Sequence, residues 1–85
     1  EIDCDGHRSG VRPDDTQRLL EIGRVLASEA ELRGVLTHAG ASYAARGAEA
    51  LARCADAERA SVVAAAQALR AAGLPCPVVS VGSTP

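Results

Sequence analysis

Side chains that can bind a ligand or move a proton follow three short apolar runs of the sequence. They are Arg8 after the run at 1–4, His38 and Tyr43 around the end of the run at 32–39, and Gly82, Ser83 and Thr84 after the run at 78–81. In a parallel α/β sheet, loops of this kind all leave from the carboxyl ends of the strands. The three groups are therefore expected to converge on one rim of a sheet.

The first group lies in the stretch EIDCDGHRSGV, which has the pattern of a short strand followed by a glycine-punctuated loop. The planar guanidinium of Arg8 can donate paired hydrogen bonds to a carboxylate, a phosphate or a phenolate oxygen. The alternative is an exposed arginine in a solvated turn, which the spacing alone favours narrowly. A calcium loop is dismissed, because Gly6 falls too early for that pattern and Arg8 occupies the position that glycine takes.

The second and third groups suit a planar ligand that carries a phosphate. His38 can stack on such a ligand or move a proton, whereas the alternative is a histidine that only ends a strand. Tyr43, the one aromatic residue, follows it closely. The stretch 82–84 offers backbone N–H groups and two hydroxyls to a phosphate, whereas the alternative is a turn before Pro85. Each of these signals is weak alone, but all of them follow apolar runs, and this shared position makes a common site a better interpretation.

Helices are expected between the three runs. Pro13 and Asp14 signal a helix start near Asp14, and the apolar spacing that follows predicts one helix face packed on a sheet. A second, alanine-rich helix is predicted from about Gly47 to Ala72, because Gly73 and the proline beyond it end the pattern. With strands at 1–4, 35–37 and from Val78, the order is β-α-β-α-β. Such units have parallel strands joined by right-handed crossovers.

The composition indicates that other segments complete this sheet. The chain has 85 residues, 47% of them hydrophobic, but only one aromatic residue and no methionine. Such a chain buries a thin core, and three strands leave two open edges. We expect a segment of a longer chain whose flanking parts supply the neighbouring strands of an open sheet or a closed barrel.

Charge and cysteine usage exclude several function classes. The net charge is -2 and the nine cations, all arginine, are scattered, so nucleic acid is not an expected partner. Without lysine, these residues cannot form a Schiff base. The three cysteines lack the CxxC spacing of zinc sites and are expected to be reduced in a cytoplasmic protein. No run is apolar and long enough to span a membrane.

EIDCDGHRSGV, LRGVLTHAGASY and VVSVGSTP, in this order, resemble the barrel domain of the D-serine dehydratase and D-threonine aldolase family. These are pyridoxal-phosphate enzymes related to alanine racemase, of fold type III. The resemblance implies that residues 1–85 are part of an alanine racemase-like (β/α)8 TIM barrel, incomplete on its own. It also implies that Arg8 donates to the phenolic oxygen of the cofactor, His38 packs against its ring and Tyr43 lies near the imine, as a catalytic and cofactor-binding residue. Gly82, Ser83 and Thr84 would hold the phosphate.

The resemblance further implies a parent lyase that acts on a β-hydroxy D-amino acid by dehydration or retro-aldol cleavage. The cofactor's lysine would lie upstream of Glu1, and the ligands of a divalent metal, zinc or manganese, downstream of Pro85. The segment alone would be inactive, and the parent could be a homodimer. Two alternatives stay open, namely a pyridoxal-phosphate-dependent amino-acid racemase and a small α/β interaction module without a cofactor.

Overall fold

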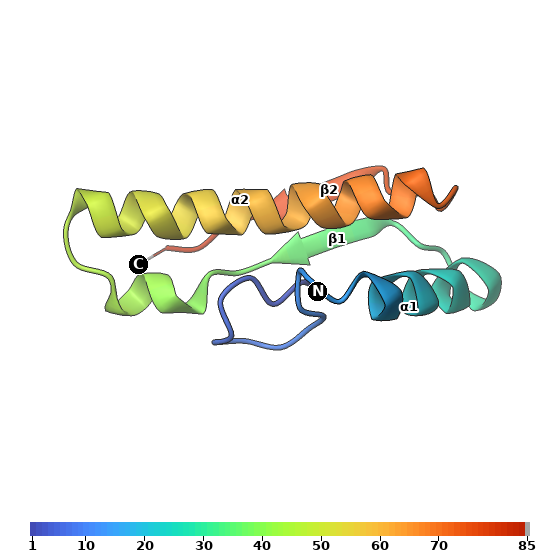
Figure 1. Ribbon diagram of the computed structural model, residues 1–85, viewed down its shortest axis with the longest axis horizontal. Coiled ribbons are helices and arrows are strands. Elements are labelled where there is room, and N and C mark those ends of the chain that lie inside the picture. Colours follow the sequence, from blue (N-terminus) through green and yellow to red (C-terminus); the bar gives the residue numbers. More distant parts are fainter. Residues whose placement is uncertain (85) are drawn as a thin grey trace.

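The protein has the expected mixed α/β architecture. The computed structural model describes residues 1–84, and Pro85 lies outside the described residues. In chain order the elements are α1 (Thr16–Glu29), β1 (Gly34–Thr37), the 3-10 helix η1 (Gly40–Ala44), α2 (Ala48–Ala71) and β2 (Val78–Val81) (Figure 1). The predicted alternation of helices with parallel strands is confirmed from β1 onward.

Strands β1 and β2 pair in parallel, with Gly34 opposite Val78 and Thr37 opposite Val81. This register requires glycine at its first position. A Cβ atom on Gly34 would lie 1.8 Å from the carbonyl oxygen of Val78, and the backbone there has φ of 156°. No side chain fits at that distance, so the close approach of the two strands depends on Gly34.

The strand predicted at 1–4 is wrong in extent, because only Ile2 pairs with the sheet. Ile2 makes isolated parallel bridges to Thr37 and to Val11, and its N–H donates to the carbonyl of Leu36 at 2.8 Å. The segment turns away directly afterwards, because the Asp3 carboxylate accepts the Gly6 N–H at 2.9 Å. Ile2 nevertheless lies beside β1, on the edge opposite β2, so three parallel segments are present in the predicted order.

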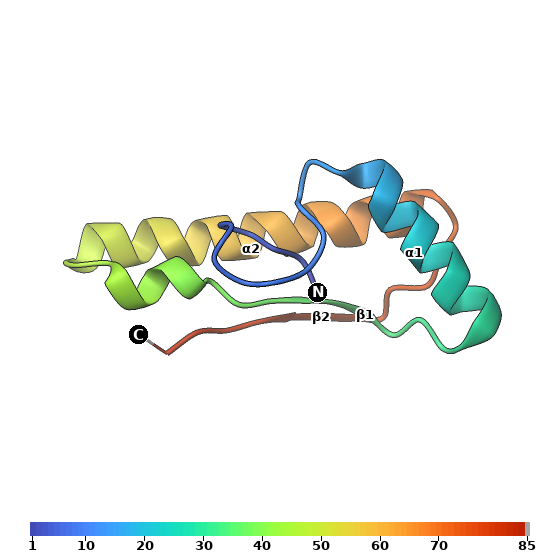
Figure 2. The same ribbon diagram turned by 90° about the horizontal axis from the view of Figure 1, so that it is seen from below.

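Helix α2 covers one face of the sheet, and no described element covers the other (Figure 2). Its buried residues Val62 and Leu69 are each 1% exposed and pack in one cluster with Ile2 and Val35. Leu36, which points the other way from Val35 in an alternating strand, is 50% exposed. The core is therefore a single layer between α2 and the strands.

Helix α1 packs mainly against α2 at the edge of the core, and not flat on the sheet as its apolar spacing predicted. The Asp15 carboxylate caps it by accepting the Arg18 N–H at 3.1 Å. The helix then contacts α2 through Gly23, where a Cβ would lie 2.9 Å from Leu69 Cδ2. A cavity of about 60 Å³ separates it from β1. Its apolar face is divided, because Leu19 and Leu20 are partly buried against the core whereas Ile22, Val25 and Leu26 stay exposed.

Helix α2 matches its predicted bounds closely, starting and ending one residue inside 47–72. Gly73, with φ of 78°, ends the helix: its N–H bonds the carbonyl of Arg70, and the next N–H bonds that of Leu69. Within residues 1–84, none of the helices is long and apolar enough to cross a membrane.

Residues 1–85 produced alone should not form a stable monomer. The small sheet has open edges, and large apolar side chains are exposed at Leu36, Val78, Val79 and Val81. We expect a broad, non-cooperative calorimetric trace and a mass above that of the monomer in light scattering. A sharp cooperative transition at low concentration, together with a monomeric mass, would contradict this prediction.

Candidate functional site

The polar groups that follow β1 and β2 leave from the same edge of the sheet. The two strands end at the same level, with Thr37 opposite Val81. The residues that follow each strand therefore start side by side. The loop after β2 then reaches η1, where the Ser42 hydroxyl donates to the Ser83 hydroxyl at 3.3 Å. Figure 1 shows the loop after β2 running from the strand toward η1. The structure thus brings the predicted second and third groups together.

His38 and Tyr43 form a stacked ring pair at this edge. Their centroids are 5.5 Å apart and their planes lie 19° from parallel, because η1 folds Tyr43 back toward the end of β1. Tyr43 is 50% exposed. The Nε2 atom of His38 is buried and has no hydrogen-bond partner among the described residues. A buried imidazole nitrogen of this kind is normally hydrogen-bonded.

The loop that carries Arg8 lies against Gly40. A Cβ on Gly40 would be 2.9 Å from the Cβ of His7 and 3.2 Å from the Cγ and Cδ of Arg8. The absence of a side chain at Gly40 therefore lets the aliphatic stem of Arg8 approach the start of η1. Arg8 itself is exposed, so its guanidinium remains available to an anion.

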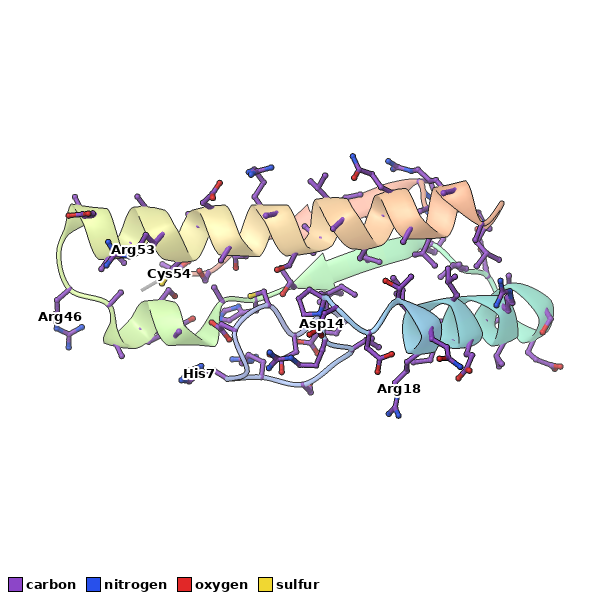
Figure 3. All side chains as sticks on the ribbon, viewed as in Figure 1. His7, Asp14, Arg18, Arg46, Arg53 and Cys54 are labelled. Carbon is purple, nitrogen blue, oxygen red and sulfur yellow. The ribbon has the colours of Figure 1, made fainter. Side chains whose placement is uncertain are left out.

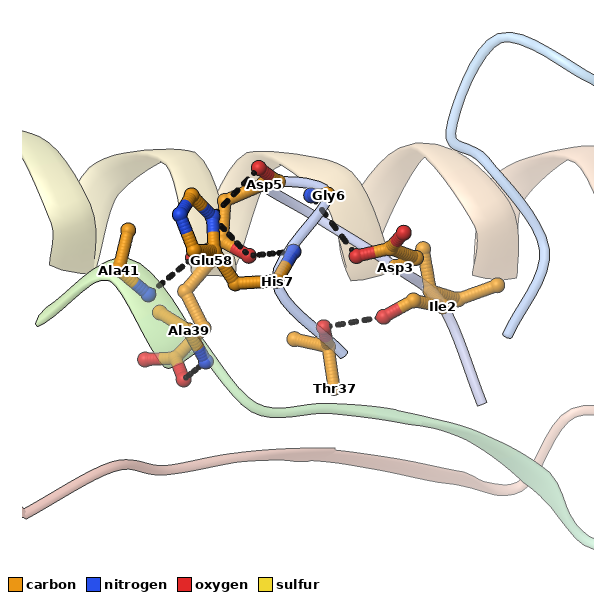
Figure 4. A network of polar contacts seen from close by, with 9 residues as sticks. All are labelled: Ile2, Asp3, Asp5, Gly6, His7, Thr37, Ala39, Ala41 and Glu58. Atoms are coloured by element: carbon orange, nitrogen blue, oxygen red, sulfur yellow. Dashed lines mark hydrogen bonds and ion pairs between the residues drawn. The ribbon is translucent and has the colours of Figure 1, made fainter. Parts of the chain in front are cut away.

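Asp5 fastens this loop to η1. One of its carboxylate oxygens accepts the Ala41 N–H at 2.8 Å, and the other accepts the His7 N–H at 3.0 Å (Figure 4). The imidazole of His7 projects outward from the loop in Figure 3, and its Nδ1 lies 3.0 Å from the carbonyl oxygen of Asp5. The Asp5 carboxylate thus serves as an acceptor for backbone N–H groups of the loop and of η1.

The remaining predicted residues lie in the loop after β2. Gly82 and Thr84 are exposed, whereas Ser83 is half-buried. Ser83 is thus the member of this group that the structure joins to the rest of the site.

Sequence reasoning missed Glu58, a buried carboxylate on α2. It is 5% exposed, and its Oε1 accepts the Ala39 N–H at 2.8 Å. The signal was present in the helix pattern, since Glu58 falls between Ala55 and Val62 at the three- and four-residue spacing of the apolar stripe. A carboxylate at such a position must bind something inside the protein.

Cys4 lies between these acidic groups. Burial raises the pKa of the Cys4 thiol, and the nearby carboxylates of Asp5 and Glu58 act in the same direction, while a hydrogen bond with Thr37 opposes them. A thiol whose pKa is raised is a poor nucleophile. The Cys4 thiol is therefore held in its protonated form. In the described part of the chain, no three His, Cys, Asp or Glu side chains are placed to hold a metal ion.

Comparison with known proteins gives closely similar relatives. Residues 1–85 match the family described as alanine racemase, N-terminal domain. The chain is 66% identical over its whole length to D-threo-3-hydroxyaspartate dehydratase from Delftia sp. (strain HT23), of which it covers 23%. It thus spans less than a quarter of that relative's length.

Solved structures of that dehydratase superpose on nearly the whole chain. The enzyme from Delftia sp. HT23 has a TM-score of 0.95 at 65% identity, over 98% of this chain and 22% of the other. A cysteine-to-alanine variant in the metal-free form gives the same values, and a histidine-to-alanine variant has a TM-score of 0.94 at the same identity and coverage. The prediction of a parallel α/β barrel segment is confirmed by this match. The chain belongs to the alanine racemase N-terminal domain family, the fold-type III group that its three loop motifs indicated.

Proposed function

We propose that this chain forms a wall of the cofactor site in a pyridoxal-phosphate-dependent lyase that removes water from a β-hydroxy D-amino acid. The observation that carries the proposal is the 66% identity, across the entire chain, to an enzyme named for the dehydration of D-threo-3-hydroxyaspartate. This makes D-threo-3-hydroxyaspartate the first substrate to test. D-serine and D-threonine are the smaller members of the same class.

The residues present fit pyridoxal phosphate in the chemistry of their donors. The cofactor has a phenolic oxygen, a planar ring and a phosphate. Arg8 offers an exposed guanidinium to the oxygen, and His38 offers a ring whose buried Nε2 is unpaired. Ser83 and Thr84 offer hydroxyls, and Gly82 a backbone N–H, to the phosphate. These roles support the proposal because the three groups leave one edge of the sheet.

Each of these side chains would act by binding, orientation or proton transfer. When bound, pyridoxal phosphate supplies an electron sink for breaking a bond at the substrate's α-carbon. Arg8 would hold the phenolic oxygen of the cofactor in its ionised form, and His38, stacked on Tyr43, would pack against the cofactor ring. Tyr43, half exposed at the rim, is the group of this chain that holds or moves a proton near the reacting carbon.

We also propose that the whole protein uses a divalent metal, zinc or manganese, bound by residues outside this chain. A variant of the related dehydratase is described as a metal-free form, which supports a metal in that enzyme. A divalent ion beside the substrate would polarise the β-hydroxyl as it leaves.

Product analysis of the full-length protein tests the reaction. With D-threo-3-hydroxyaspartate, dehydration yields a 2-oxo acid and ammonia, whereas retro-aldol cleavage yields glycine and an aldehyde. A racemase would return the epimeric amino acid unchanged in composition. Loss of ammonia release on chelation, with recovery on adding zinc or manganese, supports the metal. If the purified protein shows no cofactor absorbance after incubation with pyridoxal phosphate, the enzyme hypothesis fails and the small interaction module is favoured.

Replacing Ser83 and Thr84 by alanine in the full-length protein should weaken cofactor binding at least tenfold. The change removes two hydroxyl donors to a dianion, each worth roughly 1.5–3 kcal/mol when charge-assisted. Titration of the cofactor-free protein with pyridoxal phosphate measures the affinity. Ser28→Ala on exposed α1, which removes a hydroxyl bonded to the carbonyl of Val25, is the matched control and should leave it unchanged. Wild-type affinity in the double variant would place the phosphate elsewhere.

Arg8→Leu should shift the absorbance of the bound cofactor and lower turnover at least about tenfold, the scale of a lost charge-assisted contact in an active site. The substitution removes the cation that stabilises the ionised phenolic oxygen while keeping a side chain of some bulk. Arg18→Leu is the matched control, because Arg18 is an exposed residue of α1 whose guanidinium pairs with Asp15 (Figure 3). A wild-type spectrum together with wild-type turnover in Arg8→Leu would remove Arg8 from the site.

A further inference from the structure

The backbone between His38 and Tyr43 is attached to the rest of the protein by two carboxylates from different elements. The Ala39 N–H donates to Glu58 of α2, and the Ala41 N–H donates to Asp5 of the first loop, each at 2.8 Å (Figure 4). Hydrogen bonds to an ionised acceptor are roughly twice as strong as those between neutral groups. The segment that carries the ring pair is therefore held from two sides.

Packing does not fill the space around this segment, although Ala39 and Ser42 are buried at 1% and 3% exposure. A pocket of about 250 Å³ lies between the segment 39–45 and α2. Its lining consists largely of alanine methyl groups, at Ala39, Ala41, Ala45, Ala50 and Ala57. Such small side chains make few contacts and cannot fix the rotation of a neighbouring peptide. The two hydrogen bonds thus define where the peptide after His38 points.

Glu58 is the more informative of the two carboxylates because it cannot reach a ligand directly. It lies on the buried side of α2 at 5% exposure, and the hydrogen bond to Ala39 is the one described for its side chain. An apolar residue at this place in the stripe would avoid the desolvation of a carboxylate. The cost of burying Glu58 is explained if the orientation of the His38–Ala39 peptide matters.

We propose that Glu58 is a positioning residue, which orients the imidazole of His38 against Tyr43 through the Ala39 N–H. Because Ala39 follows His38 directly, the peptide that Glu58 binds sets the direction from which the imidazole leaves the backbone. The catalytic consequence rests on the proposed function, in which this ring pair faces the cofactor. The effect on the ring pair itself is independent of any cofactor.

Three substitutions in the full-length protein separate positioning from stability. Glu58→Leu removes the acceptor, Glu58→Gln keeps an oxygen at the same distance, and Glu49→Leu replaces an exposed glutamate of the same helix as the matched control. In Glu58→Leu, kcat per cofactor-loaded site should fall about tenfold or more, while KM changes less than about threefold. Glu58→Gln and Glu49→Leu should stay within about threefold of wild type.

A second readout needs neither cofactor nor substrate. Histidine labelled with ¹³C in the cofactor-free protein reports the His38 ring resonance, which the stacked ring of Tyr43 displaces; His38→Gln assigns it. Glu58→Leu should move this resonance, and Glu58→Gln should restore it. If Glu58→Leu does not fold, Glu58→Asp withdraws the carboxylate by one methylene and should give the same displacement.

The outcomes distinguish this inference from the proposed function. A variant without the Glu58 acceptor that keeps the wild-type resonance and the wild-type kcat, with only a lowered melting temperature, overturns the positioning role. A Glu58→Gln protein as impaired as Glu58→Leu overturns it as well. If the wild-type protein neither binds pyridoxal phosphate nor releases ammonia, the proposed function fails, and the resonance still decides the role of Glu58.

Discussion

The parallel register of β1 and β2 is the constraint on which the rest of the structure depends. Because both strands end at the same level, at Thr37 and Val81, their following loops meet on one rim, and Ser42 can reach Ser83. Ile2 adds a third parallel segment on the other side of β1, which brings the Arg8 loop to the same rim. A shift by one residue would send alternate side chains to the other face and separate these groups.

The long-range order of the fold could be predicted from the sequence, whereas contacts between elements could not. Helix α2 was placed to within a residue because an apolar stripe, Gly73 and a following proline act locally. The apolar spacing of α1 also predicted a helix, but not its packing, because Gly23 sets the contact with α2. The first predicted strand is present only as two isolated bridges at Ile2, because strand pairing depends on partners that are distant in the sequence.

The candidate site divides in the same way. Residues that carry chemistry of their own, such as Arg8, His38 and Ser83, can be picked by type and by their position after apolar runs. Residues that act on the backbone are hidden, because a glutamate that accepts one N–H has no motif. Glu58 was detectable only as a charged interruption of an apolar stripe. The 3-10 helix η1, which stacks Tyr43 on His38, is too short to leave a periodic pattern.

The close contact at Gly34 affects the opposite end of the sheet as well. It lies at the start of β1, at the end of the strand opposite the rim, and the carbonyl of Val78 approaches it too closely for any side chain. A side chain at this position would push the first residues of the two strands apart. The change in register would extend to Thr37 and Val81 at the other end. The groups at the rim would then separate, although Gly34 itself lies at the far end of the strands.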